Sequence, residues 1–259
     1  MSRVIRQSVL WMCLPALLLS TIGARAEPPG ISDAQKDQLK SLAMETRRKS
    51  EAERDTIRRA RMDLNAAYSD YKFDERKVKA ALDRIRPAQR RLLELHLDNQ
   101  VQLRQILNEQ QFQRFSEMTR KMMSGRHGFP GGEDVMWDRW PDKEMLTSLG
   151  LSDDQRRQIR ALMGPEGRRK GAFEKLRQDS EKMLELYSNY NLDTAAARKL
   201  MDSIHRDQID HSEQHHKRQQ ALCSILTESQ WQRLRKMLDE RIREFHRRRA
   251  RPDGSCPRP

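Results

Sequence analysis

Apolar residues recur every three or four positions along most of the chain, with charged residues between them. The longest stripe is formed by Val78, Leu82, Ile85, Leu92, Leu95 and Leu103. This spacing places the apolar side chains on one face of an α-helix. Asp74 and Asp193 each precede a long helical stretch, and Asp is a favoured helix N-cap residue. The pattern therefore predicts an all-α protein built from long amphipathic helices.

The pattern occurs twice, at an offset of 119 or 120 residues. Three pairs of segments match in the same order: ISDAQKDQL (31–39) with LSDDQRRQI (151–159), YSDYKFD (68–74) with YSNYNLD (187–193), and ILNEQQFQRF (106–115) with ILTESQWQRL (225–234). Such spacing indicates two copies of one structural unit. We expect two tandem helical-hairpin repeats of three or four long helices each, packed as a thin pseudo-dimer within one chain.

Composition changes divide the chain into five parts. We expect a signal peptide at 1–26, the first repeat at 27–123, a linker rich in Gly, Pro and Trp at 124–148, the second repeat at 149–249, and a basic, disordered tail at 250–259. Arg3 and Arg6 precede a charge-free, largely apolar run that ends at Ala24-Arg25-Ala26. This is the pattern of a secretory signal peptide cleaved after Ala26. We therefore expect an exported protein, and no later segment is apolar enough to cross a membrane.

Four short motifs mark helix starts at matched positions of the two repeats. In three of them a hydroxyl side chain caps the helix and a Gln three residues later reaches back: Ser32/Gln35, Ser152/Gln155 and Thr227/Gln230. Asn108 and Gln111 have the same spacing, with Asn as the cap. From capping alone we expect Thr227→Ala to cost about 1 kcal/mol of stability, and Gln230→Ala to cost less.

Composition and charge limit the classes of function and of binding partner that we expect for this chain. Of 259 residues, 34% are charged, 36% hydrophobic and 5% aromatic, and the formal net charge is +13. So little apolar mass disfavours a thick enzyme core, and the sequence contains no arrangement of residues typical of a catalytic site. We expect no enzymatic activity. In an exported protein the positive charge favours anionic membrane surfaces or acidic stretches of unfolded proteins as partners, rather than nucleic acid.

The four motifs resemble the L-T-x-x-Q motif of the Spy/CpxP family of periplasmic stress-response proteins. The residues that carry the resemblance are Leu226, Thr227 and Gln230 as a full match; Ile31, Ser32 and Gln35, and Leu151, Ser152 and Gln155, with Ser for Thr; and Leu107, Asn108 and Gln111, with Asn for Thr. The resemblance implies an ATP-independent periplasmic chaperone that binds unfolded or misfolded envelope proteins and requires no cofactor. It also implies an alternative, because the related CnrX- and ZraP-like proteins bind zinc, nickel or cobalt.

A basic run is the candidate client-binding site. Arg58, Arg59 and Arg61 lie close together on a predicted helix, and their charge would attract acidic, unfolded clients. The alternative is that these arginines only form part of a solvated helix surface, and this interpretation applies to most basic runs of the chain.

Two histidines are the candidate metal ligands. His211 and His215 are four residues apart and share a helix face, which suits the first two ligands of Zn²⁺ or Ni²⁺, and Asp207 is the nearest candidate for a third. The alternative is that this helix face is simply exposed. Cys223 and Cys256 are either isolated thiols or, in an oxidising compartment, a disulfide.

Overall fold

The structure, a computed structural model, describes residues 30–124, 143–163 and 166–249. They form eight helices and no strand: α2 (Asp33–Ala67), α3 (Glu75–Ile106), α4 (Glu109–Ser124), α6 (Lys143–Ser148), α7 (Asp153–Met163), α8 (Glu166–Ser188), α9 (Thr194–Ile225) and α10 (Glu228–Arg249). The all-α prediction is confirmed for this part of the chain. The predicted signal peptide, most of the predicted linker and the predicted tail with Cys256 lie outside the described residues. None of the described helices is long and apolar enough to span a membrane.

The longest helix of each repeat begins at the Asp that the sequence indicates. Asp74 accepts a 2.9 Å hydrogen bond from the Arg76 amide at the start of α3, and Asp193 accepts one of 2.9 Å from the Ala196 amide at the start of α9. These carboxylates satisfy amides that have no partner within the helix. The preceding segments differ, because α2 is one helix whereas the matching part of the second repeat is divided between α7 and α8 at GPEG (164–167).

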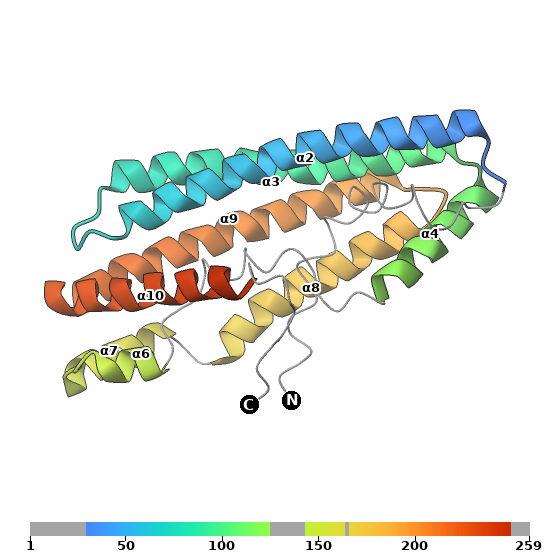
Figure 1. The fold of residues 1–259 in the computed structure, drawn as a ribbon. Coiled ribbons are helices and arrows are strands. Elements are labelled where there is room, and N and C mark those ends of the chain that lie inside the picture. Colours follow the sequence, from blue (N-terminus) through green and yellow to red (C-terminus); the bar gives the residue numbers. More distant parts are fainter. Residues whose placement is uncertain (1–29, 125–142, 164–165, 250–259) are drawn as a thin grey trace.

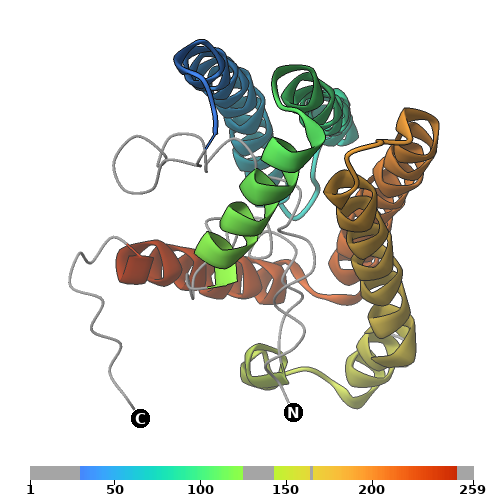
Figure 2. The same ribbon diagram turned by 90° about the vertical axis from the view of Figure 1, so that its right-hand side faces the viewer.

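The helices form two long pairs. α2 lies along α3, α8 lies along α9, and contact between α3 and α9 joins the pairs (Figures 1 and 2). The start of α2 and the end of α3 meet α4 at one end of the molecule. The end of α9 meets α6, α7 and α10 at the other end (Figure 1). α4 and the group of α6, α7 and α10 therefore lie at opposite ends of the long helix pairs.

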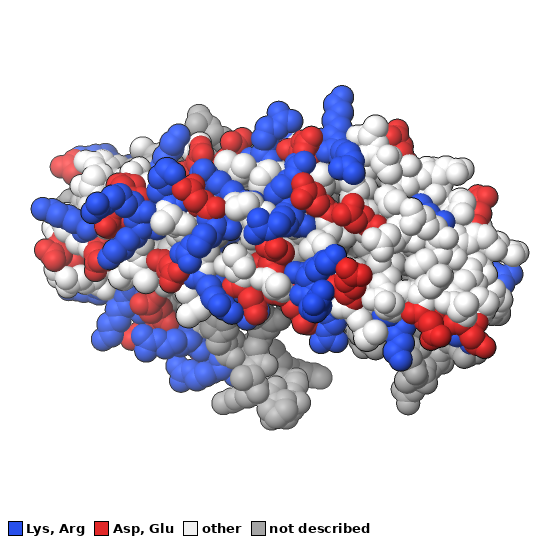
Figure 3. Space-filling model, turned by 90° about the horizontal axis from the view of Figure 1, so that it is seen from above, with Lys and Arg blue, Asp and Glu red and all other residues white. Residues whose placement is uncertain are grey.

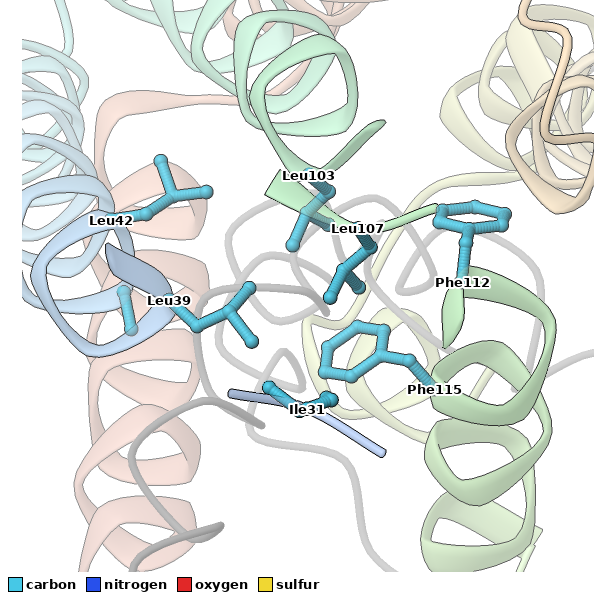
Figure 4. Packing of buried hydrophobic residues seen from close by; sticks show 8 residues of the cluster. Ile31, Leu39, Leu42, Leu103, Leu107, Phe112 and Phe115 are labelled. Carbon is cyan, nitrogen blue, oxygen red and sulfur yellow. The ribbon is translucent and has the colours of Figure 1, made fainter. Parts of the chain in front are cut away.

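The apolar core is divided into several small clusters. The cluster at the α4 end, which we call the first end cluster, is formed by Ile31, Leu39, Leu42, Ala43, Leu103, Leu107, Phe112 and Phe115 (Figure 4). The second end cluster, at the α10 end, is formed by Met145, Leu149, Leu151, Ile159, Leu222, Leu226, Trp231 and Leu234. Six residues of the second cluster lie 119 or 120 positions after residues of the first. Met145 belongs to α6, so the last part of the predicted linker contributes to this core.

Each repeat places one tyrosine against the end cluster of the other repeat. The Tyr71 hydroxyl donates a 2.9 Å hydrogen bond to the Leu226 carbonyl, and the Tyr190 hydroxyl donates one of 3.2 Å to the Leu107 carbonyl. Donors and acceptors are both 119 positions apart. An approximate twofold relation between the two halves produces such paired contacts. The tandem pseudo-dimer stays a prediction, which these contacts support.

Candidate functional site

Each of the four helix-start motifs joins an end cluster to a helix. The first residue of each motif is buried in a cluster: Ile31 and Leu107 in the first, Leu151 and Leu226 in the second. The next residue is exposed and caps the helix that follows. The motif thereby determines both where the helix starts and which side chain enters the core.

All four predicted capping arrangements are present. The cap side chain accepts a hydrogen bond from the amide of the Gln three residues later, at 3.2 Å for Ser32, 2.9 Å for Asn108, 3.2 Å for Ser152 and 3.3 Å for Thr227. In return each Gln side-chain oxygen accepts a hydrogen bond of 2.9 to 3.0 Å from the cap amide. Two amides at each helix start are satisfied in this way.

The two Gln side chains of the first repeat also bind each other. Gln35 Nε2 donates to Gln111 Oε1 at 3.0 Å and to the Ile106 carbonyl at 2.7 Å. Gln111 Nε2 donates to the Gly30 carbonyl at 2.6 Å. These bonds connect the start of α2 to the start of α4 and to the end of α3.

The second repeat contains the same arrangement. Gln155 Nε2 donates to Gln230 Oε1 at 2.8 Å and to the Ile225 carbonyl at 2.9 Å, and Gln230 Nε2 lies 3.4 Å from the Gly150 carbonyl. We call the two pairs, Gln35 with Gln111 and Gln155 with Gln230, the glutamine clasps. Sequence reasoning assigned these Gln residues to capping and missed their pairing, although Gln at the same position of two motifs in one repeat was the available signal.

A glycine with positive φ precedes the first motif of each repeat. Gly30 has φ of 89° and Gly150 has φ of 63°, a conformation that other residues rarely adopt. The carbonyl groups of these two glycines are the ones that the clasp side chains reach. A Gly is therefore part of the local structure that completes each clasp.

Arg104 links the first repeat to the turn between α8 and α9. Its guanidinium donates hydrogen bonds to the carbonyl groups of Tyr187 at 2.8 Å, Asn189 at 2.7 Å and Tyr190 at 3.0 Å. It also lies 4.2 Å from the centre of the Phe112 ring. Burial lowers the pKa of Arg104 to about 10. The residue remains charged at neutral pH, and its charge is balanced by carbonyl dipoles and an aromatic ring.

Cys223 occupies the matching position in the second repeat. Its thiol donates a hydrogen bond to the Tyr71 carbonyl, and burial raises the pKa of the thiol. The protonated thiol is the form that can donate this bond. The predicted pairing of Cys223 with Cys256 lies partly outside the described residues and stays a prediction.

The predicted client-binding arginines lie on α2, where charges of both signs alternate. Arg58 and Arg59 are exposed, and Arg61 is half-buried. Arg58 is paired with Asp55 at 2.8 Å on the same helix. The face shown in Figure 3 carries Lys and Arg interspersed with Asp and Glu over much of its length, and one end carries few charges. The three arginines thus belong to a mixed surface in which part of their charge is locally balanced.

The two candidate metal ligands lie half-buried on α9. His215 Nε2 lies 3.3 Å from Gln219 Nε2, and the His215 ring contacts the Tyr68 ring edge-on at 5.9 Å between centres. Asp207, the candidate third ligand, is paired with Lys175. Within the described ranges no group of three or more His, Cys, Asp or Glu side chains is placed to hold a metal ion. The metal site stays a prediction, without a third ligand in this part of the chain.

The neighbouring His216 has partners for both ring nitrogens. Its Nδ1 lies 2.9 Å from the Tyr68 hydroxyl, and its Nε2 lies 3.0 Å from a carboxylate oxygen of Glu75. Burial is the main cause that raises the pKa of Tyr68, so the phenol keeps its proton. The three side chains connect α2 and α3 of the first repeat to α9 of the second.

Part of the chain is similar to a known protein family. Residues 137–238 match the LTXXQ motif family. This range contains both motifs of the second repeat and its clasp. No curated protein and no solved structure matches the chain.

Proposed function

We propose that this chain is an ATP-independent, chaperone-like periplasmic protein, because residues 137–238 match the LTXXQ motif family. The family is a periplasmic family of the Spy/CpxP type, which supports this role at the level of the family. Its clients are unfolded or stress-damaged envelope proteins, and it needs no nucleotide or other cofactor.

The observation that best supports the proposal is that both repeats contain a glutamine clasp. The family match covers the second repeat, and the first repeat builds the same structure from Gln35, Gln111 and the Gly30 carbonyl. Both halves of the chain thus build the same clasp, and the half that matches the family contains one of the two. We infer that both repeats are family units and that both take part in client binding.

The division of the apolar core into small clusters is compatible with a protein that binds other proteins. The apolar side chains form small separate clusters along long helices. Two large apolar side chains on α2, Met44 and Met62, are exposed. Flexible Met side chains suit contacts with varied partners. Arg58 and Arg59 lie on the same helix and would attract acidic segments of a client.

Aggregation of a reduced, unfolding protein provides the test. Residues 27–259 should slow aggregation without nucleotide, and more strongly at low salt, because ions screen exposed charges. The charge-reversal variant Arg58→Glu/Arg59→Glu/Arg61→Glu should suppress aggregation several-fold less. A control with the same charge change on α9 is Arg198→Glu/Lys199→Glu/Lys217→Glu, at three exposed cations.

The outcomes separate the parts of the proposal. Loss of activity in both variants would assign capture to net charge and not to the basic run on α2. Activity that persists in EDTA would show that capture needs no metal. No effect on any client would contradict the chaperone role.

A further inference from the structure

The solvent face of α10 carries a row of cations. Arg233, Lys236, Arg243 and Arg247 are all exposed. They are separated by three, seven and four residues, which places them on one face of a helix. From Arg233 to Arg247 the row extends for about 21 Å at the usual helical rise of 1.5 Å per residue. Glu240 is the one acidic residue within the row. We call the four cations the basic stripe.

The opposite face of α10 holds the helix in place. Trp231 and Leu234 are fully buried in the second end cluster. Arg235 is buried as well, and its guanidinium donates hydrogen bonds to the Asn65 side chain and, at 3.3 Å, to the Asn65 carbonyl. The basic stripe is therefore held on the outside of the molecule by contacts to both repeats.

Some exposed cations on α2 form ion pairs within the helix, whereas others, such as Arg48 and Arg59, form none with a described side chain. On α2, Arg47 pairs with Glu51 at 2.8 Å, and Lys49 with Glu45 at 2.7 Å. None of the four stripe cations forms an ion pair with a side chain that the structure describes. Asp239, Glu240 and Glu244 lie within or beside the row and offset part of its positive charge, without forming an ion pair with any of the four cations.

The need for a polar outer face on this helix does not by itself explain the basic stripe. At the offset of 119, the first repeat has Arg114, Glu117, Ser124 and Gly128 in place of the four cations. α4 and α10 begin with the same type of cap and bury the same type of face. Of these positions, Arg114, Glu117 and Ser124 belong to α4 and Gly128 lies outside the described residues, so α4 has one cation where α10 has three.

We propose that the basic stripe docks on an anionic phospholipid surface. A straight row of cations on a single outward-facing helix matches phosphates that lie in a plane. The residues that flank the stripe are polar, namely Gln232, Asp239 and Glu244. An unfolded polypeptide needs apolar contacts as well, and among the described side chains beside the stripe the half-buried Met237 is the only apolar one. Contact with headgroup phosphates requires charge alone.

Vesicle co-sedimentation at low salt tests the proposal. Full-length mature protein should bind vesicles of phosphatidylcholine mixed with phosphatidylglycerol, and not vesicles of phosphatidylcholine alone. Each basic residue near an anionic surface contributes roughly a fivefold increase in binding. The variant Arg233→Gln/Lys236→Gln/Arg243→Gln/Arg247→Gln should therefore bind roughly 600-fold more weakly. The single variants Arg233→Gln and Arg247→Gln should each lose roughly fivefold.

A matched control separates the stripe from net charge. Arg48→Gln/Lys72→Gln/Lys77→Gln/Arg198→Gln removes four exposed cations elsewhere and should retain most of the binding. Circular dichroism should show the same helicity in both fourfold variants, because Gln is a good helix former.

Several outcomes would overturn the proposal. Absence of binding to anionic vesicles would do so, as would equal losses in the stripe variant and the control. Displacement from vesicles by inorganic phosphate would instead indicate a site for the free anion. If the stripe variant lost binding to soluble polyglutamate and kept binding to vesicles, the partner would be an acidic polypeptide.

Discussion

Removing one Gln of a clasp tests whether the motif does more than cap a helix. The Gln230 side chain accepts a 2.9 Å hydrogen bond from the Thr227 amide and a 2.8 Å hydrogen bond from Gln155 Nε2. Its contact with the Gly150 carbonyl, at 3.4 Å, is longer. Gln230 Nε2 also donates a 3.2 Å hydrogen bond to Gln155 Oε1, so three hydrogen bonds are lost in Gln230→Ala. At about 1 kcal/mol for each bond, and more where a partner is left unsatisfied, the expected cost is about 3 kcal/mol.

Removal of the cap itself should cost less. Thr227→Ala removes one hydrogen bond, the 3.3 Å bond from the Gln230 amide, and should cost about 1 kcal/mol. The structure thus reverses the order that capping alone predicts. Gln232→Ala is the control, because this side chain is exposed on the same helix and its one contact, to Glu228, is 3.4 Å long. It should change stability by less than 0.5 kcal/mol, roughly the range of surface substitutions.

Urea unfolding followed by circular dichroism measures all three variants. A Gln230→Ala cost at or below that of Thr227→Ala would refute the reasoning, and so would a cost equal to that of Gln232→Ala. A double-mutant cycle with Gln155→Ala isolates the clasp itself. The pair should show a coupling energy of at least about 0.5 kcal/mol if the two amides bind each other.

Three further predictions concern other parts of the molecule. Burial lowers the pKa of His96 to about 4, so between pH 6.5 and 4 the folded state binds fewer protons than the unfolded state. The free energy of unfolding should therefore fall by about 3 kcal/mol as the pH is lowered from 6.5 to 4. In urea titrations, the variant His96→Leu should show a smaller fall over this pH range. Calorimetric titration with Zn²⁺ should give weaker binding in His211→Ala/His215→Ala than in wild type, and identical isotherms would assign both rings to an ordinary helix face. Tyr71→Phe and Tyr190→Phe each remove one hydrogen bond between the repeats and should each cost about 1 kcal/mol in thermal or urea melts, whereas no loss in either would show that these bonds do not hold the halves together.

The local signals in the sequence identified the helices and their starts. A cap such as Asp74 or Ser32 acts within three residues of itself, so its effect can be inferred from neighbouring residues alone. The repeat likewise follows from comparison of the sequence with itself. The continuous α2 and the divided α7 and α8 agree with the position of the only Gly-Pro sequence in the paired segments.

The contacts between distant residues were not predictable in the same way. Gln155 and Gln230 are 75 positions apart, and the Tyr71 hydroxyl and the Leu226 carbonyl are 155 apart. Period and propensity say which face of a helix is apolar, but they do not say which helices meet. Pairing on α2 could not be inferred either, because the Arg58 side chain selects Asp55 among several nearby acids only once the helix is formed.

The two ends of the molecule are alike, and its middle is not. Each end contains a clasp formed within its own repeat and a tyrosine from the other repeat, so a change at Tyr71 or Tyr190 removes a partner in the other half. In the middle, His96 of α3 is fully buried, and neither ring nitrogen has a hydrogen-bond partner among the described residues. Its counterpart on α9, His215, is half-buried beside Tyr68. Substitutions in the middle and on the solvent face of α10 leave the end contacts intact. These are therefore the places where the second repeat can acquire a property that the first repeat lacks.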